Sequence, residues 1–73
     1  MATFRQEFGV VVRRHRHKRG LSQEAFAERA DIHRTYVSKI EAGKVDLGLE
    51  VARRVARALR MRLSQLIREA EAG

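Results

Sequence analysis

Proline is absent from this chain of 73 residues, and three glycines, Gly20, Gly43 and Gly48, interrupt it between segments of helical apolar spacing. Without proline, glycine is the main residue that stops a helix. Apolar residues in the segments recur at i, i+3, i+4 and i+7 rather than at every second position, which argues against strands. The sequence therefore predicts an all-α fold, a compact bundle of five short helices forming a single domain over residues 1–73.

The boundaries of the predicted helices follow from capping residues. Ser22 is placed to cap the second helix and Ser64 the fifth, because a hydroxyl accepts a hydrogen bond from a free N–H of the first turn. Asp31 follows the second helix and is the residue there that best tolerates a left-handed backbone. The expected helices are 3–19, 22–29, 34–42, 49–60 and a last one after Leu63, with 48–72 supplying core and dimerisation surface.

Charge and hydropathy restrict the class of partner. The 16 Lys and Arg against 9 Asp and Glu give a formal net charge of +7, which favours nucleic acid or an anionic membrane. The longest apolar run, residues 10–12, is far below the roughly 18 residues of a membrane span and precedes the basic cluster, unlike a signal peptide. We therefore expect no membrane partner and a cytoplasmic location, at the nucleoid.

Cysteine is also absent, which excludes disulfides and thiolate metal sites, and no histidine has a carboxylate at the spacing of a zinc site. We expect no metal, cofactor or small-molecule ligand. Oligomerisation is the remaining means of stabilising so short a chain. The apolar stripe of the last helix is therefore expected to form a twofold homodimer interface, through Leu63, Leu66 and Ile67.

Residues 22–42 predict two short helices joined by a tight turn, the arrangement of a helix-turn-helix. Ala27 is small where the two axes approach, while Phe26 and Val37 fill the angle between them. The second helix then points its polar residues outward, as a helix that reads the major groove requires. The expected base-contacting residues are Arg34, Thr35, Ser38 and Lys39.

The segments 20–30 and 34–43, Gly-Leu-Ser-Gln-Glu-Ala-Phe-Ala-Glu-Arg-Ala and Arg-Thr-Tyr-Val-Ser-Lys-Ile-Glu-Ala-Gly, resemble the Cro/lambda-repressor type of helix-turn-helix domain, the xenobiotic-response-element family. The resemblance extends over roughly residues 8–67. It implies a transcriptional regulator that binds a palindromic operator in double-stranded DNA as a homodimer, with RNA polymerase as a further candidate partner. The run 31–38 and the lack of a second domain are most similar to controller proteins of restriction–modification systems.

Several positions depart from the family pattern, including Leu47-Gly48 in place of a common Pro-Ser and His15 where an apolar residue is usual. Asp31 stands where Gly is usual, and Arg60 replaces a Gly that normally ends the fourth helix. His33 replaces the customary Ser or Thr cap of the recognition helix, so this cap is expected to be weak or supplied by Asp31. The departures leave the DNA-reading unit intact.

The resemblance further implies a phosphate contact by Gln23, at a helix N-terminus that itself favours anions. Arg34 is the strongest candidate for base readout, because a guanidinium can bond guanine at both O6 and N7. For Thr35 and Lys39, base contact and backbone contact are both open. The remaining expected phosphate contacts are Ser22, His33, Tyr36, Arg19 and Lys44.

The family also places an Arg and an acid at the positions of Arg16 and Glu41. We expect a largely buried, bidentate salt bridge between them that ties the first helix to the end of the third. The alternative is that Arg16 contacts phosphate and Glu41 is an exposed acid at a helix end.

Other function classes remain as alternatives. A phage Cro-like repressor has the same fold. An antitoxin that masks a toxin is disfavoured, since only 68–73 would remain as a tail. Ser38 as a nucleophile would need an oriented base, which His33 does not provide. We expect no enzymatic activity.

Overall fold

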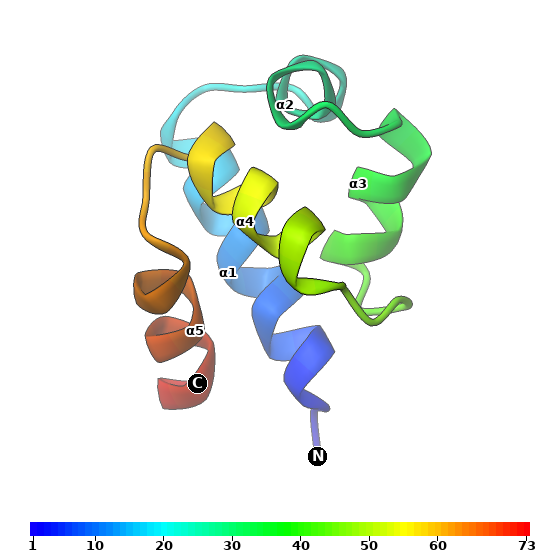
Figure 1. Ribbon diagram of the computed structural model, residues 1–73. Helices are drawn as coiled ribbons and strands as arrows, with labels where there is room; N and C mark the ends of the chain where they lie inside the picture. The colour runs from blue at the N-terminus through cyan, green and yellow to red at the C-terminus, as the bar shows by residue number, and fades with distance from the viewer.

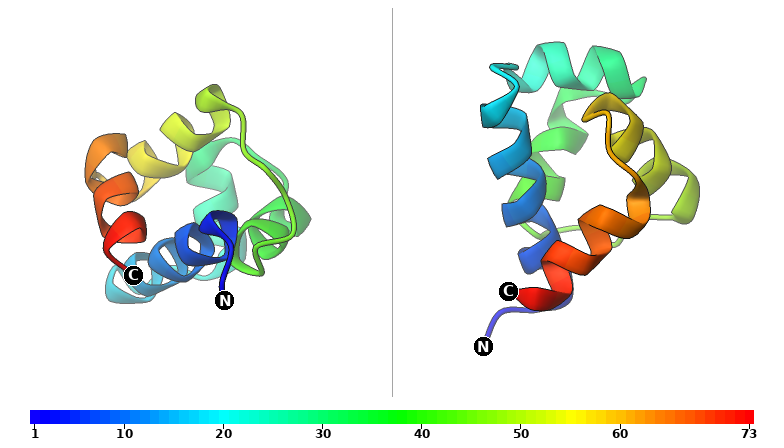
Figure 2. Two further views of the ribbon diagram at one scale, coloured as in Figure 1. Left: turned by 90° about the horizontal axis from the view of Figure 1, so that it is seen from below. Right: turned by 90° about the vertical axis from the view of Figure 1, so that its left-hand side faces the viewer.

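The computed structural model describes residues 1–73 and contains five α-helices and no strand (Figure 1). None of the helices is both long and apolar enough to cross a membrane. Helix α5 runs back beside α1, so the two ends of the chain lie close together (Figure 2), with Gly73 next to Glu7. The helix bounds are Phe4–Lys18 (α1), Gln23–Ala30 (α2), Arg34–Glu41 (α3), Leu49–Ala58 (α4) and Leu63–Ala72 (α5).

Local sequence explains where α1 and α2 begin. Thr3 caps α1, because its hydroxyl oxygen accepts a hydrogen bond from the N–H of Gln6. The N–H of Thr3 in turn donates to the side-chain oxygen of Gln6. Ser22 caps α2 by accepting from the N–H of Ala25 at 3.0 Å, as predicted. Both caps satisfy N–H groups that the helix itself leaves free.

The turns confirm one prediction and correct two. Asp31 adopts the left-handed conformation, with φ of 56°. Helix α3 is capped by the side chain of His33 itself and not by Asp31. The prediction that Ser64 caps α5 was wrong: the cap position is Arg62, two residues earlier, and its side chain makes no capping bond. Burying the apolar side of α5, including Leu66, outweighs the local preference of a serine.

The core lies between all five helices. Its largest completely buried side chains are Phe26, Ile40, Leu59, Leu66, Val12, Val37 and Val55. Leu66 is 0% exposed within its own chain. Its predicted place in a dimer interface was therefore wrong, because α1 covers more of α5 than the sequence pattern suggested.

Helices α1 and α3 approach each other at Gly9. A Cβ at this position would lie 2.3 Å from the carbonyl oxygen of Ile40 and 2.8 Å from that of Glu41. Any side chain would overlap these main-chain atoms. The hydrogen atom of glycine is what permits α1 to lie directly against α3.

Candidate nucleic-acid interface

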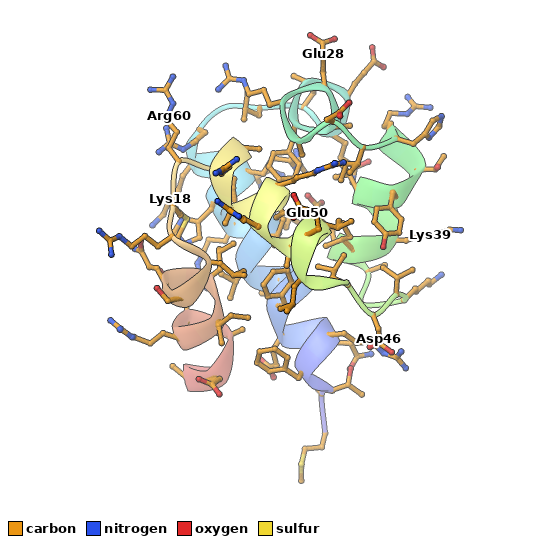
Figure 3. All side chains as sticks on the ribbon, viewed as in Figure 1. Lys18, Glu28, Lys39, Asp46, Glu50 and Arg60 are labelled. Carbon is orange, nitrogen blue, oxygen red and sulfur yellow. The ribbon has the colours of Figure 1, made fainter.

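The outer face of α3 carries the side chains expected to read bases. Arg34, Thr35, Ser38 and Lys39 are all exposed, and Figure 3 shows Lys39 pointing into solvent. On the opposite face, Val37 and Ile40 are 0% and 2% exposed. The helix therefore has one face fixed in the core and one free, which a protruding major-groove reader needs.

The N-terminus of α3 is organised by His33. Its Nδ1 accepts hydrogen bonds from the N–H of Thr35 at 3.1 Å and from the Thr35 hydroxyl at 2.8 Å. A ring nitrogen that accepts these bonds carries no hydrogen, so the ring N–H of this tautomer is on Nε2. His33 therefore holds Thr35 in one orientation and has an exposed N–H available for a phosphate.

Arg34 lies beside the first turn of α2. Its Nη1 is 3.6 Å from Oε2 of Glu24, and the two side chains are 61% and 79% exposed. So exposed a pair contributes under about 1 kcal/mol, and its partners exchange readily with solvent. The guanidinium is therefore positioned near the recognition surface and available for another acceptor.

Between α2 and α3 is an open, polar hollow of about 730 Å³. Ser22 and Gln23 line it at the N-terminus of α2. The Ser22 oxygen accepts the capping hydrogen bond, so its hydroxyl proton is available to a phosphate oxygen. Gln23 donates from Nε2 to Oε1 of Glu41 at 3.2 Å, which leaves its amide oxygen and second N–H available.

Arg16 and Glu41 form the bidentate ion pair behind this hollow. Nε of Arg16 lies 2.6 Å from Oε2 of Glu41 and Nη2 lies 3.0 Å from Oε1. A third donor, Nη1, bonds the carbonyl oxygen of Leu21 at 2.8 Å. The side chains are 8% and 5% exposed. Arg16 is thus occupied by internal acceptors, and the alternative of a surface phosphate contact does not describe it.

Three predicted phosphate contacts, Arg19, Tyr36 and Lys44, lie outside this hollow. Arg19 donates from Nε to the carbonyl oxygen of Leu59 at 2.6 Å and so caps the end of α4, away from α3. Tyr36 is half-buried and packs against the core. Lys44 is exposed just after α3, with no ion-pair partner. The bond from Arg19 to Leu59 spans 40 residues and was not expected from the sequence, and a phosphate contact by its free terminal NH₂ groups stays a prediction.

An apolar hollow of about 280 Å³ lies at the end of the molecule that carries the start of α1. Leu63 and Ile67 line it as half-buried residues, together with Phe4 at 47% and Leu49 at 83% exposure. The exposure of Phe4 and Leu49 was not predicted from the sequence, because both residues continue the apolar face of a helix. Their position in the first turn of α1 and of α4 was the available signal.

Comparison with known proteins agrees with this geometry. Residues 12–66 match the family model described as Helix-turn-helix, HTH_3. The chain belongs to this family. It is 41% identical over 54 residues to Control protein C.MunI of Mycoplasma sp., covering 74% of this chain and 73% of that protein.

Two further family members align over most of their length. Control protein C.BamHI of Bacillus amyloliquefaciens is 38% identical over 61 residues, which cover 82% of this chain and 75% of that protein. The crystal structure of the restriction-modification controller protein C.AhdI from Aeromonas hydrophila superposes with a TM-score of 0.83 at 32% identity. The superposition covers 85% of this chain and 94% of that one.

Proposed function

We propose that this protein is a sequence-specific transcriptional regulator of double-stranded DNA, acting as the controller protein of a restriction–modification system. The observation that carries the proposal is the recognition helix α3, whose exposed polar face is held rigidly by a buried inner face and by the Arg16–Glu41 pair. Controller proteins among the relatives support the assignment.

The contacts divide into two kinds by position. Arg34, Thr35, Ser38 and Lys39 lie on the outer face of α3 and are assigned to base edges, or to both bases and backbone. Ser22, Gln23 and His33 lie at helix N-termini beside that face, where free N–H groups favour phosphate. Lys44 and the Tyr36 hydroxyl extend this phosphate contact at the edges of α3.

The proposed regulator binds as a twofold homodimer through the apolar hollow. Phe4 and Leu49 expose large apolar surfaces beside the half-buried Leu63 and Ile67. Pairing this surface with its copy removes it from water and separates two recognition helices by about 34 Å, one turn of DNA. The proposed operator is therefore a palindrome with half-sites one helical turn apart.

The test is selection of bound sequences from a random duplex pool, followed by sedimentation of the protein with and without the selected site. We expect a palindromic consensus and one dimer per site. Ile67→Glu should give monomers with much weaker operator binding, whereas the control Val10→Glu, at an exposed apolar residue outside the hollow, should remain dimeric. A non-palindromic consensus bound by monomers, or no consensus, would refute the proposal.

A further inference from the structure

A second concentration of positive charge lies away from the recognition helix. A polar hollow of about 650 Å³ is bounded by the end of α1, the end of α2 and the turn between α4 and α5. Figure 3 places Lys18 and Arg60 at the edge of the view opposite Lys39. Four cationic side chains line the hollow, and none of them forms an ion pair: Lys18, Arg19, Arg29 and Arg60.

The hollow brings four cations together without an acid among them. No carboxylate is among its lining residues. The acid next to it, Glu69, is bonded to His15 at 2.7 Å and to Arg14 at 2.9 Å. Several cations elsewhere in the chain do form ion pairs, as in the pairs of Arg34 with Glu24 and of Arg54 with Asp31. Like charges that converge without a counter-charge repel one another, and an anion relieves that repulsion.

Arg19 is held in place at this site. Its Nε bonds the carbonyl oxygen of Leu59 at 2.6 Å, and its two terminal NH₂ groups have no partner within the protein. A guanidinium that is already held by one N–H loses less conformational entropy when its remaining N–H groups bind a ligand. Its planar arrangement of donors suits phosphate oxygens.

Arg60 is at this site in spite of its backbone. Its φ is 56°, in the left-handed region that glycine adopts without strain. The strain gains nothing for the fold, since glycine would end α4 as well. What Arg60 adds is its positive charge in the hollow. A strained backbone kept for the sake of a charge indicates that the charge binds a ligand.

We propose that this hollow, defined by Lys18, Arg19, Arg29 and Arg60, binds a multiply charged phosphate anion, separately from DNA on α3. A single carboxylate carries one negative charge and cannot balance four cations. A chain of phosphate groups carries several negative charges within a short distance, as four cations in one hollow require. The phosphates come either from a polyphosphate, as in a nucleoside triphosphate, or from a further nucleic-acid strand. The recognition face and the apolar hollow share none of these residues.

The central experiment titrates the full chain with sodium tripolyphosphate and follows backbone amide resonances. We expect the largest shifts at Gly20, Arg60 and Met61, with little change at Thr35 and Ser38. Arg60→Gly should weaken binding about tenfold, as expected for loss of a charged hydrogen-bond donor. The control Arg68→Gln removes one exposed charge of α5 outside the hollow and should leave the affinity nearly unchanged.

The fold is monitored in the same series. Arg60→Gly should raise the Tm by a few degrees, because it removes the left-handed strain. Weaker binding in a more stable protein cannot be a consequence of unfolding. If Arg60→Gly and Arg68→Gln weaken binding equally, or if the shifts centre on α3, the proposed site does not exist.

The second arm distinguishes the source of phosphate. The variant Arg34→Ala/Lys39→Ala is titrated with a random-sequence duplex, with and without Arg60→Gly. Residual binding that Arg60→Gly abolishes identifies a nucleic-acid strand as a ligand of the hollow. Binding of tripolyphosphate without such residual binding identifies a free polyphosphate. Equal affinity for oligoglutamate of matched charge, or no binding of either phosphate probe, would overturn the proposal.

Discussion

Arg16 and Glu41 share two hydrogen bonds, at 2.6 and 3.0 Å, in a position almost completely excluded from water. Arg16 also bonds the carbonyl oxygen of Leu21, and Gln23 also bonds the Glu41 carboxylate. Four segments therefore meet at one pair of charges: α1, the turn after it, the start of α2 and the end of α3. Every donor that Arg16 directs inward has an acceptor, which is the condition under which a buried ion pair is tolerated.

Removing the carboxylate should test this arrangement directly. Glu41→Ala strands a buried guanidinium and should lower the free energy of unfolding by about 3–5 kcal/mol, most of the stability of a domain this small. Urea unfolding followed by circular dichroism measures the change. The control Asp46→Ala removes the exposed partner of Arg5 and should cost under about 1 kcal/mol. An equal loss of unfolding free energy in the two variants would show that the buried pair contributes no more than an exposed one.

Gly9 should be intolerant of any side chain. Gly9→Ala places a methyl group 2.3 Å from the Ile40 carbonyl oxygen, so α1 and α3 must separate, at a cost of about 1–3 kcal/mol or more. The Tm and the affinity for the selected operator should fall together, because α3 moves. At Gly48 nothing lies within 4 Å, and Gly48→Ala should change stability by less than about 1 kcal/mol. A Gly9→Ala protein as stable as wild type contradicts the close approach.

Stability at acid pH should depend on Glu69. Its pKa is lowered from the ordinary value of 4.5, first by the hydrogen bond from His15 and further by Arg14, although partial burial opposes them. A carboxyl with a lowered folded-state pKa stabilises the fold above its ordinary pKa, and this stabilisation is lost as pH falls through the lower value. The advantage of wild type over Glu69→Gln, about 0.5–1 kcal/mol at pH 7, should therefore shrink below pH 4.5. Urea melts at pH 3 and 7 measure it, and a difference that is independent of pH would remove Glu69 as the cause.

Base and phosphate contacts should respond differently to substitution. Arg34→Ala should cost about 1–3 kcal/mol on the operator and relax the preference at one position of each half-site. Gln23→Ala should weaken specific and random DNA alike. Binding titrations on both DNAs, with repeated site selection for each variant, separate the two effects. An unchanged selected sequence for Arg34→Ala would assign it to the backbone.

Much of this architecture could be predicted because its causes are local. The cap at Ser22 and the left-handed turn at Asp31 depend only on neighbouring residues. The helical spacing of apolar residues predicted the five helices in order. The Arg16–Glu41 pair spans 25 residues and was predicted through the family resemblance, since spacing alone does not bring these residues together.

The features that sequence reasoning missed depend on contacts distant in the chain. Leu66 belongs to the core only because α1 packs against α5, and Arg19 caps α4 across 40 residues. His33 had an unexpected role, because capping by an imidazole nitrogen depends on which nitrogen carries the proton. Gly9 gave no sequence signal, since it ends no helix and lies within one.

The contact at Gly9 also bears on how operator preference can change. The separation of α1 from α3 is set there by main-chain atoms, which substitutions elsewhere leave in place. The four outward side chains of α3 take no part in that contact or in the core. On the proposed assignment of these side chains to base reading, single substitutions on α3 can change DNA preference without passing through unstable intermediates. Different operators can then be acquired while the scaffold beneath α3 stays unchanged.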